Sequence, residues 1–146
     1  MNLSGNELDN TEQLGRTLEQ CTKLTHLDVS NNNWMDLSKN DFDFQRSLNK
    51  CKGLMHQNLS FNMLISSNSL FFEQVLPEWS VLTHLDLTAC LIQDDVVGYI
   101  AAVLPACQAL THLNLSGNLI TETGASNIAV VLSRCPALTD LNLSNY

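Results

Sequence analysis

One nine-residue leucine pattern recurs along the chain and limits its possible folds more than any other feature. The pattern reads Leu-x-x-Leu-x-Leu-x-x-Asn, and successive copies start 30, 28, 28 and 28 residues apart. The copies start at Leu24, Leu54, Leu82, Leu110 and Leu138. Half of an earlier copy remains between Leu3 and Asn6. Repeats of this length indicate a solenoid, because a single unit buries its apolar face only against its neighbours.

An apolar pair with helical spacing stands between successive copies. Its second member is a Leu six positions before the next copy, and its first member lies four positions earlier on the same helix face. The pairs are Leu14 and Leu18, Phe44 and Leu48, Phe72 and Leu76, Ile100 and Leu104, and Ile128 and Leu132. Each repeat is therefore predicted to be a strand, a turn and a helix. Stacked repeats give an α/β solenoid shaped as a horseshoe arc, with parallel strands on the concave face and the wider helices on the convex face.

The residues of the concave face follow from the alternation of side chains along a strand. Leucines at template positions four and six face the core, so positions three, five and seven are predicted to face outward. Positions three and five supply the predicted partner-binding residues, which are His26, Asp28, His56, Asn58, His84, Asp86, His112, Asn114 and Asp140. Position seven adds Ser30, Ser60, Thr88, Ser116 and Ser144. Phe61, just beyond the second strand, is predicted to be an exposed contact at the rim.

All four histidines occupy position three, and Asp140 closes the series. Neighbouring strands lie about 4.8 Å apart, so the rings should form a row near stacking distance. Two adjacent imidazolium charges would repel by about 1 to 3 kcal/mol, which disfavours full protonation. A pH-sensitive or metal-capturing row is one hypothesis. Inheritance of a duplicated Leu-Thr-His-Leu consensus is the interpretation we favour, and no metal site is predicted.

Asparagine and cysteine each occupy a structural column. Position nine carries amides that can bond the backbone of neighbouring turns, at Asn6, Asn32, Asn62 and Asn118, with Cys90 as the exception. The other cysteines stand three residues before a copy, at Cys21, Cys51, Cys107 and Cys135. Because no Cys-x-x-Cys pair exists, the cysteines are predicted to be small buried hydrophobes rather than zinc ligands, disulfides or reactive thiols. Trp34 and Trp79, which align with apolar residues of other repeats, are predicted to lie in the core.

The charge balance excludes several classes of partner. The formal net charge is −8, and no Lys or Arg lies between Gly53 and Ser133, which argues against nucleic acid and anionic membrane surfaces. Another protein with a basic surface fits this balance.

The longest apolar run, Val96 to Leu104, is too short for a bilayer, and no secretory signal is visible, so a cytoplasmic location is expected. No Gly-rich phosphate loop or catalytic grouping is visible, so neither an enzymatic activity nor a cofactor is predicted.

The copies quoted above, with their 28-residue period and Asn or Cys at position nine, resemble the ribonuclease-inhibitor-like class of leucine-rich repeats. They are similar to repeats in ribonuclease inhibitor, in NOD-like receptors and in Ran GTPase-activating proteins. The resemblance implies a protein–protein interaction scaffold that binds its partner through the concave face and the rim loops. Activation of a GTPase, as by the Ran GTPase-activating proteins, is the alternative, although Arg16, Arg46 and Arg134 offer no obvious arginine finger.

Two departures from the template and the chain ends carry further expectations. Gln57 stands where an inward leucine is expected, and a buried amide without partners would destabilise the core. The segment 34–48 is longer and more polar than its equivalents. The sequence opens within a half repeat and stops just after a strand, so residues 1–146 are expected to be a single domain of about five and a half repeats, a fragment without caps. Self-association through the uncapped ends is a further hypothesis.

Overall fold

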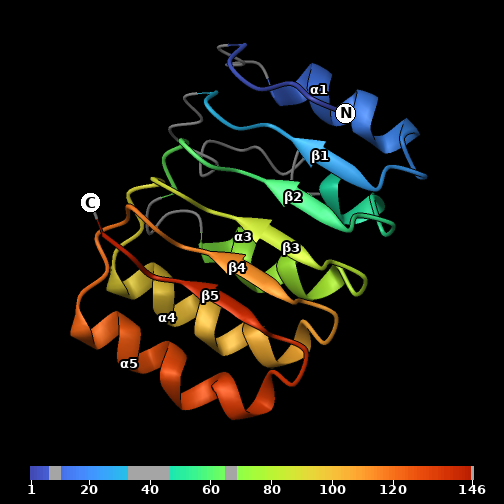
Figure 1. The fold of residues 1–146 in the computed structure, drawn as a ribbon. Helices are drawn as coiled ribbons and strands as arrows, with labels where there is room; N and C mark the ends of the chain where they lie inside the picture. Colours follow the sequence, from blue (N-terminus) through green and yellow to red (C-terminus); the bar gives the residue numbers. More distant parts are fainter. Residues whose placement is uncertain (7–10, 33–46, 65–68, 146) are drawn as a thin grey trace.

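The computed structural model describes residues 1–6, 11–32, 47–64 and 69–145. Within them, five strands form one parallel sheet in the order β1-β2-β3-β4-β5. The strands are β1 (His26–Asp28), β2 (His56–Asn58), β3 (His84–Asp86), β4 (His112–Asn114) and β5 (Asp140–Asn142). Strands that follow one another in the sequence are also neighbours in space, as a solenoid requires (Figure 1).

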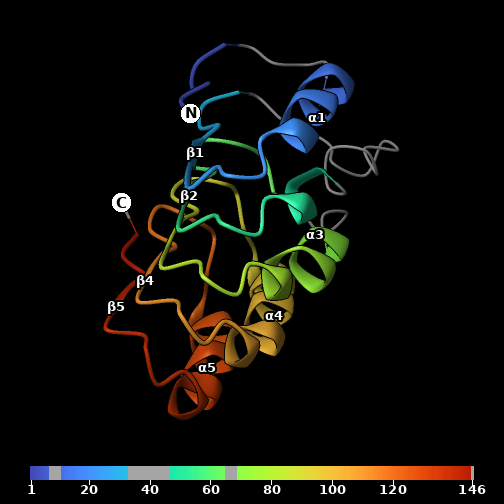
Figure 2. The same cartoon turned by 90° about the vertical axis from the view of Figure 1, so that its right-hand side faces the viewer.

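Helices cover one face of the sheet, while the opposite face is open (Figure 2). They are α1 (Thr11–Gln20), α3 (Ser69–Gln74), α4 (Asp94–Val103) and α5 (Glu122–Val131). This layering confirms the predicted α/β solenoid, with parallel strands on the inner face and helices on the outer face. Among the described residues, no helix is both long and apolar enough to cross a membrane.

Three of the leucines predicted to end the helical pairs lie in a different element. Short 3-10 turns follow three of the helices, at η2 (Leu76–Glu78), η3 (Leu104–Ala106) and η4 (Leu132–Arg134). Pro77 and Pro105 stand in the first turn of η2 and η3, where the missing N–H breaks no helical hydrogen bond. In these three repeats the α-helix therefore ends before the predicted leucine, whereas Leu18 lies within α1 as predicted.

The strands pair without any shift in register. Every template position therefore forms a column across the sheet, with His26, His56, His84, His112 and Asp140 in one column. The segment at the amino terminus extends the same arrangement, because Leu3 N–H donates to Asp28 O at 2.8 Å and Asp28 N–H donates to Met1 O at 3.0 Å. Identical short strands can stack in this way only when their inward leucines meet, and a slip of one residue would turn them outward.

The core fills the space between the sheet and the helices. Leu27, Leu85 and Leu113 from position four are each at most 2% exposed, and the position-six residues are buried as well. Trp79 is a core residue, as predicted, and its indole N–H donates to Leu48 O at 3.2 Å. Trp34 lies outside the described residues. All five cysteines are free, and four of them are buried, at Cys51, Cys90, Cys107 and Cys135.

The amides at position nine connect successive repeats, as predicted. Asn62 Nδ2 donates to Val29 O of the preceding repeat at 3.1 Å, and its Oδ1 accepts from Asn32 N–H at 3.1 Å. Asn118 donates in the same way to Leu87 O at 2.8 Å. Cys90 replaces one amide of this ladder, and its thiol donates to Leu59 O at 3.3 Å. The sulfur thus substitutes for the amide donor at the cost of a weaker hydrogen bond.

Position seven was wrongly assigned to the concave face. Ser30, Ser60, Thr88 and Ser116 are between 5% and 9% exposed, so these side chains are buried. The strands end at position five, and the position-seven N–H then donates back to the position-five side chain, as from Ser30 to Asp28 Oδ1 at 3.0 Å. This turn ends the alternation of side chains on which the prediction depended. The position-seven side chain is therefore buried instead of facing the concave side.

Candidate functional site

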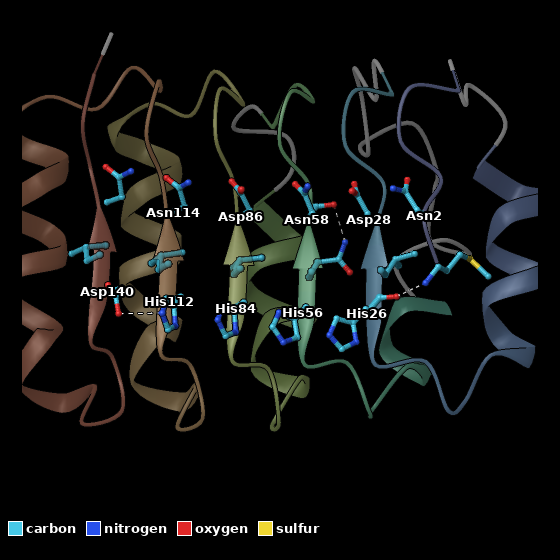
Figure 3. A pocket seen from close by; sticks show the side chains of 17 residues that line it. Asn2, His26, Asp28, His56, Asn58, His84, Asp86, His112, Asn114 and Asp140 are labelled. Carbon is cyan, nitrogen blue, oxygen red and sulfur yellow. Dashed lines mark hydrogen bonds and ion pairs between the residues drawn. The ribbon is translucent and has the colours of Figure 1, made fainter.

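A hollow of about 720 Å³ runs across the concave face of the sheet. The side chains of positions three and five line it, together with Met1 and Asn2. Figure 3 shows them as two rows, with the histidines in one and Asp28, Asn58, Asp86 and Asn114 in the other. The structure thus brings together all nine residues predicted to bind a partner, and their role in binding stays a prediction.

The four imidazoles form one continuous stack. Ring centroids are 4.2 Å apart between His26 and His56, 4.1 Å between His56 and His84, and 4.1 Å between His84 and His112. The ring planes deviate from parallel by 10° to 17°. Asp140 ends the column, with its Oδ2 3.2 Å from His112 Nε2. The predicted row of histidines is confirmed, and the two central rings, His56 and His84, are stacked on both faces.

Threonines at template position two determine how the rings are protonated. Thr83 Oγ1 donates its proton to Met55 O at 2.9 Å and lies 2.8 Å from His84 Nδ1. A hydroxyl carries one hydrogen, so when the Thr83 hydroxyl donates to Met55 O, its contact with the ring needs Nδ1–H as the donor. In that arrangement neutral His84 carries its proton on Nδ1 and keeps a lone pair on Nε2. This ring offers the hollow a hydrogen-bond acceptor.

The same geometry recurs one repeat further on. Thr111 Oγ1 donates to Thr83 O at 2.9 Å and contacts His112 Nδ1 at 2.8 Å. Asp140 lies on the other side of this ring, with its Oδ2 within hydrogen-bonding distance of His112 Nε2. His56 follows Met55 instead of a threonine, so this bond does not set its proton position.

The stack resists the uptake of charge in its centre. Partial burial lowers the pKa of His56 below its ordinary value, and the neighbouring imidazoles His84, His26 and His112 lower it further. Partial burial is also the main cause that lowers the pKa of His84. The neighbouring His112 lowers it further, whereas the Asp140 carboxylate raises it. The two central rings, His56 and His84, are therefore mostly neutral at neutral pH and take up protons only on acidification.

Side chains at position five offer one free polar atom each. Their Oδ1 atoms accept the N–H two residues later, at 3.0 Å for Asn58, 2.9 Å for Asp86 and 3.1 Å for Asn114. The second carboxylate oxygen of Asp28 and Asp86 has no ion-pair partner among the residues that the structure describes. No Lys or Arg lines the hollow. The face is therefore acidic when the imidazoles are neutral.

Neither metal binding nor thiol chemistry is supported by these side chains. In a stacked pair of imidazoles the Nε2 lone pairs run parallel, so they do not converge on one ion. In the described ranges, no group of three or more His, Cys, Asp or Glu side chains could hold a metal ion. Burial raises the pKa of the Cys90 thiol to about 12 and that of the Cys107 thiol to about 11, so both are protonated and unreactive.

Apolar side chains are exposed in the loops that follow the strands. Phe61 is 57% exposed, as predicted, and its φ of 55° places it in the left-handed region. Leu91 and Leu119, which sequence reasoning missed, are 41% and 53% exposed after β3 and β4. Both occupy template position ten, directly after position nine, and they lie one 28-residue period apart. This recurrence was the sequence signal that could have identified them.

Parallel strands backed by helices, a repeating amide ladder and a 28-residue period define a leucine-rich repeat solenoid. One repeat of this chain, residues 109–130, matches the family described as Leucine Rich Repeat. Among solved structures, the chain is similar to an internalin (inlF) from Listeria monocytogenes str. 4b F2365, with 18% identity and a TM-score of 0.45. The similarity covers 94% of this chain and 38% of that one, so this chain spans well under half of its length. No curated protein matches the sequence.

Proposed function

We propose that this chain is a non-catalytic scaffold that binds another protein through the concave face and the rim loops. The observation that carries this proposal is the hollow of about 720 Å³ on the concave face, which polar side chains of positions three and five line. We assign the repeats to the ribonuclease-inhibitor-like class, a proposal supported by their 28-residue period.

The partner is proposed to have a basic surface. Asp28, Asp86 and Asp140 contribute three carboxylates to the hollow, and the cation nearest to them is the Met1 ammonium, which donates to His26 O at 2.7 Å. Complementary charge increases the rate of association and suppresses wrong partners more than it adds affinity. An apolar contact is therefore needed as well.

Phe61 is the proposed apolar anchor at the rim. A bulky residue in the left-handed region costs about 1 to 2 kcal/mol relative to its normal conformation. The equivalent positions carry Gly5 and Gly117, which adopt this conformation without strain, and Asn31 and Ala89, which share the positive φ but have smaller side chains. Strain at an exposed aromatic side chain suggests a contribution to binding, because it contributes nothing to the core. Leu91 and Leu119 extend the same rim.

GTPase activation, the alternative, gains no support from the described residues. Arg16 belongs to α1 and Arg134 to η4, both on the helical side of the sheet, and Arg46 lies outside the described residues.

We also propose a cytoplasmic location, which the five free cysteines favour because thiols persist in a reducing compartment. Association of two copies through the ends of the sheet is retained as a proposal that sedimentation velocity would test.

Affinity capture with matched variants tests the proposed function. The bait carries Asp86→Asn, His84→Gln and Phe61→Ala together, and the control bait carries Glu73→Gln on α3, on the opposite side of the sheet. Quantitative mass spectrometry of captured proteins should show partners that the control retains and the triple variant loses. Equal recovery by both baits, with both folded by circular dichroism, would mean that this face does not bind them.

A further inference from the structure

We propose that the hollow binds an extended basic segment of its partner at neutral pH and releases it when the imidazole column takes up protons. This inference rests on the proposed function and names both the partner's chemistry and the control of the complex. It combines three features of the described residues: the spacing of the carboxylates, the fixed tautomers of the rings and the stacking of the column.

Two carboxylates stand on alternate strands in the position-five row. Asp28 lies on β1 and Asp86 on β3, with the amide of Asn58 between them on β2. Asp140 on β5 belongs to the position-three row, beside His112. With neighbouring strands about 4.8 Å apart, Asp28 and Asp86 are separated by about 10 Å across the sheet. An extended chain in the polyproline II conformation repeats every three residues, or about 9.3 Å, so a segment with Lys or Arg three positions apart matches this pair.

The neutral ring edges complement the same partner. His56 and His84 have a ring stacked on each face, at centroid distances of 4.1 to 4.2 Å, so a partner meets the edges of these two rings. Thr83 fixes His84 with its acceptor nitrogen free, and ammonium and guanidinium groups carry donors only. When the rings are neutral, the hollow therefore offers hydrogen-bond acceptors from both the ring nitrogens and the carboxylates.

Protonation converts this face from acceptor to donor. A protonated imidazole offers N–H donors at both nitrogens, so the acceptor on His84 is lost. The charges that meet in the hollow are the four histidines, the carboxylates of Asp28, Asp86 and Asp140, and the Met1 ammonium. Each proton that the column takes up offsets the charge of one carboxylate. A basic segment is then attracted less strongly and meets positive ring edges.

Fluorescence anisotropy with synthetic peptides tests this inference. The probe is a fluorescein-labelled peptide of four Ser-Pro-Lys repeats, and its matched control contains four Ser-Pro-Glu repeats. We expect the lysine peptide alone to bind at pH 7.5, and its Kd to rise at least tenfold at pH 5.0. If binding needs one neutral group of ordinary histidine pKa, about 6.5, the Kd rises about thirtyfold between pH 7.5 and pH 5.0, and a lowered pKa reduces that factor.

Two variants assign the pH dependence to the column. Changing all four histidines to Gln should reduce the tenfold effect to less than threefold, and His84→Gln alone should reduce it in part if the fourfold variant does not fold. Asp86→Asn should weaken binding at pH 7.5, whereas Glu73→Gln should not. No binding of the lysine peptide at pH 7.5, equal binding of the glutamate peptide, or an unchanged pH dependence in the histidine variants would overturn the inference.

The outcome is separable from that of the proposed function. If the peptide fails to bind while protein capture still depends on Asp86 and His84, the scaffold function stands and the basic, proton-released partner is wrong. If capture is also indifferent to these residues, both proposals fail.

Discussion

Single residues that depart from the repeat template show where the core of this solenoid is less stable. Gln57 lies in the column of Leu27 and Leu85 and is 2% exposed. Its Nε2 donates to Asn58 O at 3.3 Å, but its buried Oε1 has no hydrogen-bond partner. A buried polar atom without a partner keeps the full cost of its lost hydration. Gln57 is therefore a weak point in the core.

Gln57→Leu should stabilise the protein. The change restores the template residue and removes the unpartnered amide oxygen, so the free energy of unfolding should rise by about 1 to 3 kcal/mol. Urea denaturation followed by circular dichroism measures it. The reverse change in the next strand, Leu85→Gln, is the matched control and should lower stability. A lower urea midpoint for Gln57→Leu would show that the amide has a partner in solution.

Phe61→Gly should separate stability from binding. Relief of the left-handed strain should raise the free energy of unfolding by about 1 kcal/mol, because glycine adopts a φ of 55° freely. The same change should reduce capture of the partner. Gly117→Ala, at a φ of 67°, is the converse control and should lower stability by about 1 kcal/mol. A Phe61→Gly protein that is less stable would indicate that the ring supports the fold.

Neighbouring elements are joined by a polar clamp between α4 and α5. Asp94, in the first turn of α4, accepts from Thr121 N–H at 2.9 Å through Oδ1 and from the Thr121 hydroxyl through Oδ2. Thr121 is the N-cap of α5, so the carboxylate of one helix holds the start of the next. A Cβ at Gly124 would overlap Asp94 Oδ1, which explains the glycine there. The clamp fixes how the last two repeats stack.

Removal of the clamp should destabilise the protein in a pH-dependent way. The hydrogen bond from the Thr121 side chain, followed by backbone donors, lowers the pKa of Asp94. A lowered carboxyl pKa contributes stability above the unfolded value of about 3.9, and that stability is lost as the pH falls through the folded pKa. Asp94→Ala should therefore reduce Tm at pH 7 and have less effect below pH 4.

Differential scanning fluorimetry of Asp94→Ala across pH 3 to 7 measures this. Glu73→Ala, which removes an exposed carboxylate from α3, is the control and should leave Tm unchanged. Gly124→Ala should reduce Tm at neutral pH by displacing the same carboxylate. A deficit in Asp94→Ala that stays constant down to pH 3 would assign the effect to helix propensity instead of the clamp.

At the scale of the whole molecule, the histidine column links all repeats to pH. Folding lowers the pKa of His56 and His84, mainly through partial burial. Below the ordinary histidine pKa of about 6.5, the unfolded chain therefore binds more protons than the folded one. Since protons then favour the unfolded state, stability should decrease as the pH falls from 7 to 5.

Urea midpoints at pH 7 and pH 5 test this coupling. The wild-type midpoint should be lower at pH 5, and the double variant His56→Gln and His84→Gln should show a smaller difference between the two pH values. Glu73→Gln should keep the wild-type difference. An identical difference in the double variant would place the pH dependence in the carboxylates and exclude the column.

Periodicity alone predicted the architecture and the lining of the hollow. Contacts between equivalent residues of successive repeats follow from a 28-residue period, because identical strands stack in register to bury their leucines. Leu27 above Gln57 and His26 above His56 are such contacts, as is the amide ladder of Asn32 and Asn62. These needed no knowledge of the tertiary structure.

Only the tertiary structure decided the contacts that depend on the exact geometry of the turns and on the approach of single atoms. The turn after Asp86 buries Thr88, the Asp94 clamp joins one pair of helices, and Phe61 takes a left-handed conformation. The tautomer of His84 depends on the distance from Thr83 to a carbonyl group of another strand. Each depends on how closely particular atoms approach in three dimensions, and a template of averaged residue types contains no such distances.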